Sequence, residues 1–236
     1  MSKFKVFNGF GIKPTKSYEA AGWDFYVPAI NNPDETTEDR FIEAVKKSYG
    51  KTDKQITTIM GRMENEMRLF GHDELYQKWK YTMLLLFLSV DGAIMRSSQN
   101  KVATFISYYL VWSEDERPGI SLHCNDHIFL NSGIKVILDK HTAGVFANKS
   151  GRGNKGWDIR ACVVDEDYSG YVHLSLAYTK DNADDGKIYA GDKLTQMLIL
   201  NIVPKDGCEE VDENEYMKHF VNSERGDNGF GSTDKN

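Results

Sequence analysis

The segment from Cys162 to Leu174 places the strongest constraint on the fold of this chain. In it, two runs of alternating apolar and polar residues flank a polar stretch, 165–170 (DEDYSG). Successive side chains of a strand point to opposite faces of a sheet, so two such runs around a turn predict a β-hairpin. Short alternating runs separated by turns recur along the chain. They favour a mainly β fold, a jelly-roll-like β-barrel.

Two glycine-rich segments carry groups that bind anions. Segment 148–156 (NKSGRGNKG) combines cations, a hydroxyl and backbone N–H groups that can converge on a phosphate, although the same composition occurs in ordinary basic surface loops. Segment 225–233 (RGDNGFGST) offers the Arg225 fork for phosphate oxygens and the Phe230 ring for stacking, although glycine-rich tails are often flexible linkers. Phosphate and ring together suggest a nucleotide ligand.

Two further segments enter apolar strands, one with a single carboxylate inside the strand and the other with a single amide. Segment 20–26 (AAGWDFY) is a small-residue turn that runs into a strand containing Asp24. Segment 191–200 (GDKLTQMLIL) is a turn that enters an apolar strand containing Gln196. A buried amide or carboxylate needs a partner, so both residues are candidates for a site.

In order and spacing, the hairpin and these four segments resemble the five motifs of the trimeric dUTP pyrophosphatase (dUTPase) family. The hairpin, with VVDEDYSG, and the tail, with RGDNGFGST, match the family patterns most closely. The resemblance covers residues 4–30 and 119–236. It includes 130–136 (LNSGIKV), which is similar to the strand that leads toward the family's second motif.

The resemblance implies a hydrolase that converts dUTP to dUMP and pyrophosphate, controlling the dUTP level and supplying dUMP. Water would attack the α-phosphorus in line, with Asp165 as the base and Gln196 holding that water and a phosphate oxygen. The hairpin backbone would recognise uracil, and Tyr168 would pack under the deoxyribose and exclude a 2′-hydroxyl. The resemblance also implies a set of further substrate-binding residues: Lys149, Ser150, Gly151, Arg225, Phe230, Gly231, Ser232 and Thr233.

The resemblance implies a metal and an assembly as well. Mg²⁺ would be held by the three phosphates and mostly by water. Asp24 would contact the metal indirectly, through a bound water, or would instead pair with a neighbouring cation or serve as a structural turn residue. The family is homotrimeric, with active sites at subunit interfaces, and the C-terminal arm, 222–236, would come from a third chain and close the site.

The chain departs from the family pattern at two places. The second motif usually reads Pro-Arg-Ser-Gly-Leu-Ala, but Asn148 and Lys149 stand at the first two positions, and Arg152 and Gly153 at the last two. Lysine keeps the charge and loses the bidentate fork, so we expect the phosphate contacts to be weaker here or to pass to Arg152. Ile159 occupies a position where the family often carries an asparagine.

The first and second motifs lie much farther apart than in the family, which implies an insertion of about 80 residues, 32–117. Thr36 and Asp39 predict a variant capping box at its first helix, and the apolar stripe from Ile56 to Phe70 predicts a second. We therefore expect a β core made of residues 1–31 and 118–236, interrupted by a helical insertion.

Two more helices are expected in the insertion, one over 73–95 and one that begins near Lys101. The apolar run 83–88 is too short to span a membrane, so it predicts a buried helix of a small bundle. The methionines of the second helix predict ordinary core packing rather than a binding groove.

Composition narrows the class of protein and its partners. The 236 residues are 40% hydrophobic and carry a formal charge of -6, which disfavours binding to nucleic acid or anionic membranes. Cys124, Cys162 and Cys208 show neither a metal-binding spacing nor an even-numbered disulfide framework, and the N-terminus has no sustained apolar stretch. We expect a soluble cytoplasmic protein.

Two alternatives stay open. A dCTP deaminase shares the fold but places a catalytic glutamate in a different motif, and the Asp165 hairpin and the tail count against it. A regulatory dUTPase homologue would act on a protein partner through 32–117. In that case removal of the insertion would abolish partner capture and spare dUTP hydrolysis, whereas loss of both would indicate a structural role.

Overall fold

The computed structural model describes residues 4–17, 19–161, 163–181, 186–204, 207–208 and 210–218. The chain divides into two compact units, residues 1–201 and residues 202–236. The described part of the second unit contains a short helix, α7 (Glu213–Lys218). The predicted arm, 222–236, lies outside the described residues, and with it the predicted contacts of Arg225, Phe230, Gly231, Ser232 and Thr233.

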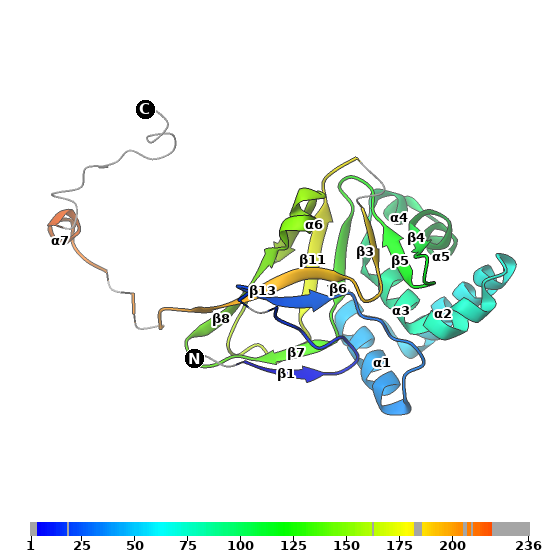
Figure 1. Ribbon diagram of the computed structural model, residues 1–236, viewed down its shortest axis with the longest axis horizontal. Coiled ribbons are helices and arrows are strands. Elements are labelled where there is room, and N and C mark those ends of the chain that lie inside the picture. The colour runs from blue at the N-terminus through cyan, green and yellow to red at the C-terminus, as the bar shows by residue number, and fades with distance from the viewer. Residues whose placement is uncertain are drawn as a thin grey trace. The chain divides into compact units, whose positions relative to one another are not determined.

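The strands described in the first unit form four antiparallel sheets, which confirms the predicted mainly β, jelly-roll-type fold (Figure 1). The first sheet pairs β1 (Lys5–Asn8) with β7 (Ile134–Ile137). The second has the order β10 (Val163–Val164), β8 (Thr142–Asn148), β13 (Lys193–Asn201) and β2 (Trp23–Tyr26). The third has the order β3 (Val90–Asp91), β6 (His127–Asn131), β11 (His173–Tyr178) and β9 (Trp157–Ala161). The fourth has the order β12 (Lys187–Tyr189), β5 (Pro118–Ser121) and β4 (Leu110–Trp112).

The predicted hairpin is split at its tip. Strand β9 pairs with β11, and the register begins at Ala161 opposite Ser175. The residues nearest the turn do not continue this ladder, because β10 pairs with β8 in a different sheet, with Val164 opposite Gly144. The prediction of two strands paired up to the turn was therefore wrong near the tip. Alternation of apolar and polar residues indicates that one face of a strand is buried, but it does not indicate which neighbouring strand it pairs with.

Alternation does account for the core between the sheets. Leu174 and Leu176 of β11 are each 1% exposed, whereas the intervening Ser175 is half-buried. Trp157 of β9 packs against Tyr178 of β11 with ring centroids 5.6 Å apart. Burial of such large apolar side chains is the main favourable term in folding.

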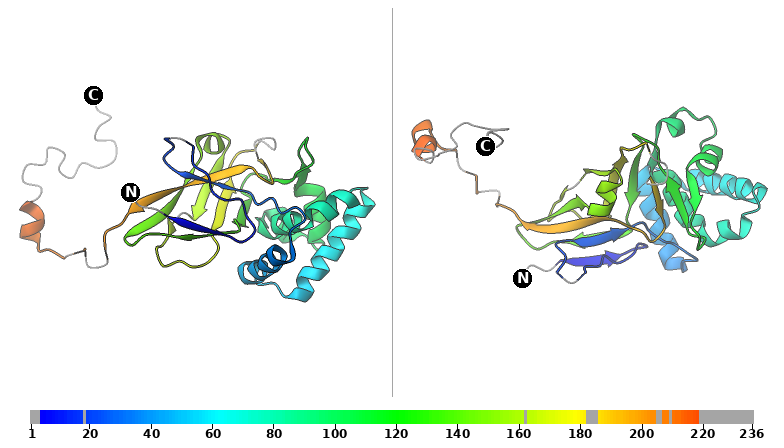
Figure 2. Two further views of the ribbon diagram at one scale, coloured as in Figure 1. Left: turned by 60° about the horizontal axis from the view of Figure 1, so that its bottom comes forward. Right: turned by 45° about the horizontal axis from the view of Figure 1, so that its top comes forward.

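The helical elements between residues 35 and 109 gather on one side of the sheets (Figures 1 and 2). They are α1 (Glu35–Tyr49), α2 (Asp53–Leu69), α3 (Asp73–Ser89), α4 (Ala93–Ser97), α5 (Lys101–Thr104) and a π-helical turn, η1 (Phe105–Tyr109). The predicted third helix, 73–95, ends earlier because Val90 and Asp91 leave the helix and pair with β6. Among the described residues, no helix is long and apolar enough to cross a membrane.

The helix starts and the buried faces refine the sequence predictions. The predicted capping box at Thr36 was wrong, because Asp34 caps α1 by accepting a hydrogen bond from the Thr37 N–H at 2.7 Å. The methionine stripe is core, as predicted: Met63 and Met67 of α2 are fully buried. The apolar run of α3 that was predicted to be buried is also in the core, and its residues 83–86 have no exposed surface.

Several contacts join the helical segment to the strands. Phe41 of α1 packs edge-on against Phe10, with ring centroids 5.3 Å apart, and against Tyr81 of α3 at 5.5 Å. Thr82 of α3 exchanges hydrogen bonds with the backbone of Ile30, at 2.7 and 3.1 Å. The helices therefore belong to the same compact unit as the sheets, and the boundaries of the insertion at 32 and 117 stay a prediction.

Candidate active site

Asp24 lies at the centre of a charged cluster where β2, β8 and β13 meet. The Lys149 ammonium lies 2.5 Å from its Oδ1 and the Lys193 ammonium 2.8 Å from its Oδ2. The Asp24 side chain is 7% exposed, so this carboxylate is buried and paired through both oxygens. Lys149 is the residue before helix α6 (Ser150–Asn154), so the pair fixes the start of the glycine-rich segment.

The charges around Asp24 set its ionisation. Burial alone would raise the pKa of its carboxyl, but the hydrogen bonds from Lys149 and Lys193 outweigh burial and hold the pKa below its usual value. A lowered folded-state pKa stabilises the protein at pH values above the unfolded-state pKa of about 3.9. That stabilisation is lost as the pH falls through the lower folded-state pKa.

Replacing Asp24 with Asn should therefore lower stability at pH 7 by about 1–3 kcal/mol, because two lysines lose their shared acceptor. The free energy of unfolding of the parent should decline as the pH falls from about 5 to about 3, and that of Asp24→Asn should decline less. Urea unfolding at a series of pH values measures both. Glu114→Gln, at an exposed residue, serves as the control, and parallel pH curves for the parent and Asp24→Asn would contradict the pairing.

Gln196 lies beside this cluster, directly opposite Asp24 in the pairing of β13 with β2. Its Nε2 donates to the Asn148 carbonyl at 3.2 Å, which supplies the partner that a half-buried amide needs. Gly22 leaves the space for this side chain, because a Cβ there would lie 3.2 Å from Gln196 Oε1.

A cationic pocket of about 480 Å³ opens next to the cluster. Lys149, Gly151 and Arg152 contribute to its wall from the glycine-rich segment. Asp192 holds Arg152 in place through an ion pair of 2.9 Å. The remaining lining residues are Lys155, Lys187, Tyr189, Asp192 and Lys193. Five lysine or arginine side chains against one carboxylate make this pocket suited to a phosphate group.

Asp192 also joins this pocket to the end of the helical segment. Its Oδ1 lies 3.2 Å from Arg117 Nη1, and its Oδ2 accepts from the Tyr189 N–H at 3.2 Å. Arg117 further donates to the Ala190 carbonyl at 2.6 Å. Asp192 therefore fixes both Arg117, at the end of the predicted insertion, and Arg152, in the glycine-rich segment.

The split hairpin carries Asp165 and Tyr168. Asp165 follows β10 directly and is exposed, and its carboxylate forms no hydrogen bond or ion pair with another described residue. Tyr168 folds over Gly170, where a Cβ would lie 2.5 Å from the hydroxyl, and donates to the Tyr171 carbonyl at 2.8 Å. Burial raises the pKa of the Tyr168 hydroxyl, which therefore stays protonated near neutral pH.

The predicted site residues that the structure describes thus fall into two groups. Asp24, Lys149 and Gln196 lie together at the cationic pocket, with Ser150 and Gly151 at the start of α6. Asp165 and Tyr168 lie on the hairpin, and Tyr168 lines a different pocket. In the described part of the chain, no hydrogen bond or ion pair joins the two groups.

Lys193 and Asp192 were missed by the sequence reasoning. Both stand in the quoted segment GDKLTQMLIL, but charged residues beside a turn are usually solvated, and nothing in the spacing indicates that they pair with Asp24 and Arg152. Arg152 is itself held by Asp192 and by the Lys187 and Lys193 carbonyls, so its guanidinium is partly committed to the fold.

The described residues contain no group of three or more histidine, cysteine, aspartate or glutamate side chains able to hold a metal ion. Both oxygens of Asp24 are already paired with lysines. Three roles were considered for Asp24: contact with a metal-bound water, pairing with a neighbouring cation, and a structural role in a turn. This arrangement favours pairing with neighbouring cations over contact with a metal-bound water.

Comparisons with known proteins find similarity to dUTPases. Residues 119–234 match the family model for dUTPase. The deoxyuridine 5′-triphosphate nucleotidohydrolase of Candida albicans is 35% identical over 108 residues, which cover 45% of this chain and 64% of that protein. Residues 119–234 are therefore similar to dUTPases.

Solved dUTPase structures are similar at lower identity. A mutant dUTPase of Staphylococcus bacteriophage 80alpha with dUpNHpp is 19% identical, with a TM-score of 0.40 over 49% of this chain and 80% of that chain. A mutant dUTPase from phage phi11 of S. aureus, described with a structural Mg(II) ion, is 18% identical, with a TM-score of 0.35 over 40% and 78%. The segment that matches the dUTPase family model contains the glycine-rich segment, the hairpin and Gln196, whereas Asp24 precedes it.

Proposed function

We propose that this protein hydrolyses dUTP to dUMP and pyrophosphate. The observation that carries the proposal is the cationic pocket at Lys149, Gly151 and Arg152, inside the segment that matches the dUTPase family model and next to the paired Asp24. A triphosphate with about four negative charges needs such local cations, because the chain as a whole is acidic.

The hairpin would recognise the base and the sugar of the substrate. Residues 165–171, between β10 and β11, belong to no strand, so their backbone N–H and C=O groups are not part of a sheet ladder. Such groups can donate to and accept from the edge of a base, as a pairing base would. Tyr168 at the turn would then pack against the sugar, which gives discrimination against UTP.

The proposed base is Asp165. Its exposed carboxylate has no partner among the described residues, so it is available to take a proton from water as that water attacks the α-phosphorus. Gln196 donates through Nε2 to Asn148, and its Oε1 accepts no hydrogen bond from another described residue. That oxygen can orient the attacking water.

The proposed assembly is a homotrimer. Lys149 and Tyr168 line different pockets of one chain, and a site built between subunits would bring a phosphate pocket of one chain to a hairpin of another. Mg²⁺ bound to the substrate phosphates would neutralise charge on the leaving pyrophosphate. A protein partner for the helical segment and a cytoplasmic location stay predictions.

The test is pyrophosphate release from dUTP in the presence of Mg²⁺, with dTTP, dCTP and UTP as comparisons. We expect release with dUTP and at most slow release with the other three. A folded protein that leaves dUTP intact would contradict the proposal, and equal rates with all four nucleotides would contradict the role given to the hairpin.

A further inference from the structure

A pocket of about 430 Å³ is formed by the helical segment and the short strand β3. All its lining residues fall between 49 and 102, inside the predicted insertion. It shares no lining residue with the cationic pocket or with the pocket that Tyr168 lines, so it is separate from every described residue that the proposed function assigns to dUTP. Its volume is within the range of about 300–1,000 Å³ typical of small-molecule sites.

The floor of this pocket is apolar. Four buried side chains line it from α3, β3, α4 and α5: Phe87, Val90, Met95 and Val102. The half-buried Ile59 of α2 and Leu88 of α3 extend this surface. Most of it is aliphatic, and Phe87 already packs edge-on against Phe105, with ring centroids 5.5 Å apart. The floor therefore suits an alkyl group better than a stacked base.

The polar part of the lining is strongly cationic. Lys51 comes from the turn before α2, Arg62 from α2 and Lys101 from the start of α5. None of these three forms an ion pair with another described residue, so they are available to an anion. Arg96 of α4 pairs with Asp91 at 3.0 Å, and both side chains are more than half exposed, so water weakens this pair.

One carboxylate does not cancel this charge. Among the described residues that line the pocket, Asp91 is the only acidic one, against four lysine or arginine side chains. The chain as a whole carries a formal charge of -6. An anion would therefore be attracted by this local group of cations and not by the overall charge of the protein.

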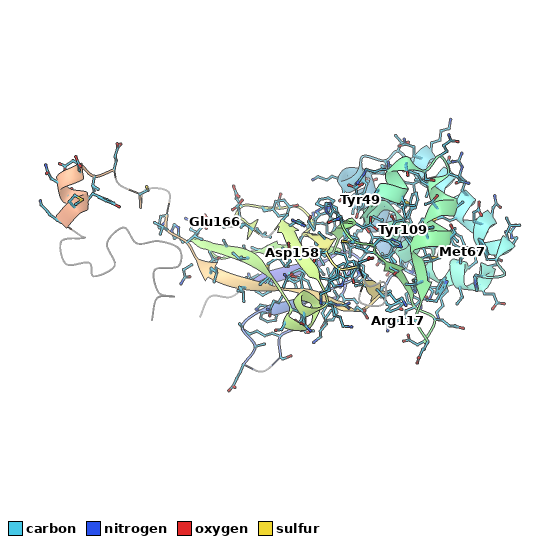
Figure 3. All side chains as sticks on the ribbon, turned by 90° about the horizontal axis from the view of Figure 1, so that it is seen from above. Tyr49, Met67, Tyr109, Arg117, Asp158 and Glu166 are labelled. Carbon is cyan, nitrogen blue, oxygen red and sulfur yellow. The ribbon has the colours of Figure 1, made fainter. Side chains whose placement is uncertain are left out.

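The walls of the pocket are held in place by hydrogen bonds. Tyr49, which Figure 3 labels where the helices meet the strands, donates to the Phe129 carbonyl at 2.9 Å and accepts from the Asn131 N–H at 3.1 Å. Strand β3 pairs with β6. The hydroxyls of Ser98 and Thr104, 2.6 Å apart, join the end of α4 to α5. Because these bonds fix the walls, the pocket exists without a ligand and would lose little ordering entropy on binding.

We infer that this pocket binds an amphipathic carboxylate, with its alkyl chain on the apolar floor and its carboxylate at Lys51, Arg62 and Lys101. A saturated chain that ends in a carboxylate combines the apolar and the anionic group that the lining requires. Arg62 can hold such a group through two parallel hydrogen bonds. The ligand needs neither a base nor a sugar, so the inference does not depend on the proposed hydrolysis of dUTP.

Titration calorimetry of the full chain with hexanoate, octanoate and 1-octanol tests this inference. We expect one octanoate per chain. Each added CH₂ should tighten binding by about three- to fourfold from hexanoate to octanoate, because each methylene removes a similar apolar area from water. 1-Octanol has the same chain without the charge, and it should bind at least about tenfold more weakly than octanoate.

A pair of double variants locates the site. Arg62→Glu with Lys101→Glu should weaken octanoate binding by about tenfold or more, since two attractive contacts become repulsive. The control, Lys5→Glu with Lys140→Glu, makes the same change in net charge at two exposed lysines outside the pocket and should bind octanoate as the parent does. All four residues are exposed, so the thermal midpoints of both variants should stay close to that of the parent.

Three results would overturn the inference. They are no octanoate binding to the parent, equal affinity for hexanoate and octanoate, and equal affinity for octanoate and 1-octanol. Unchanged binding in the pocket variant would place the ligand elsewhere, and equal weakening in both double variants would show an effect of net charge. Calorimetry measures binding without dUTP, so these results stand apart from the proposed hydrolysis. Pyrophosphate release by the pocket variant should match that of the parent.

Discussion

Replacing Asp165 with Asn is expected to lower kcat for dUTP hydrolysis by about 10²–10⁴-fold, since the amide cannot take the proton from the attacking water. KM should change little, because the amide has nearly the shape of the carboxylate. Stability should be unchanged, because the Asp165 side chain is exposed and bonds to no other described residue. Initial rates of pyrophosphate release over a range of dUTP concentrations, with thermal unfolding alongside, measure all three.

Asp167→Asn is the matched control for this prediction. Asp167 is a second exposed carboxylate of the same turn, so its change removes the same charge from the same surface. It should leave kcat close to that of the parent. An equal loss in both variants would show that the charge of the turn matters rather than a base at Asp165, and full activity of Asp165→Asn would remove Asp165 from the mechanism.

Replacing Phe41 with Ala should destabilise the first unit by about 3–5 kcal/mol. Phe41 has no exposed surface and lies between Phe10, which follows β1, and Tyr81 of α3. Its loss leaves a cavity where the helical segment meets the strands. Urea unfolding followed by circular dichroism should show one cooperative transition displaced to a lower midpoint.

Phe70→Ala is the control that tests whether the loss of stability depends on burial of the phenyl ring. Phe70 ends α2 in the same helical segment but is 57% exposed, so its removal should cost less than about 0.5 kcal/mol. If Phe41→Ala melted the helices alone and left the strands folded, the helical segment would be a separable module. A single transition would support the structural role of the segment and would predict that deleting 32–117 unfolds the strands as well.

Much of the fold could be predicted because local pattern and burial agree. In the apolar stripe of α2, Ile56, Met63 and Met67 are buried as expected, whereas Phe70 at its end is 57% exposed. Residues 83–87 of α3 are buried as expected. The boundaries depend on single contacts that periodicity does not report. Asp34 caps α1 in place of Thr36, and α3 stops where Val90 begins to pair with β6.

The sequence could predict those site residues that stand in recognisable motifs. Asp24, Lys149 and Gln196 were chosen from separate segments, and the structure brings them together. The pairing of Lys193 with Asp24 and the split between β10 and β11 were not predictable, because both depend on which strands become neighbours. The pocket that Tyr168 lines, between α1 and the strands β6 and β11, was missed for the same reason: its two walls come from segments about 80 to 130 residues apart, and pairing over that distance leaves no local signal.

The ion pairs of Asp192 limit how the helical segment can change during evolution. Arg117, where the chain returns from the helices, and Arg152, in the phosphate-binding segment, share this one carboxylate. An insertion or deletion near Arg117 would move a charge away from the pocket that it helps to shape. The turns at Gly50 and Gly71 have positive φ and open space around them, so they can absorb extra residues without disturbing neighbours. Length differences among natural variants of this protein should therefore accumulate at those two helix ends, while the return to the strands at Arg117 keeps a constant length.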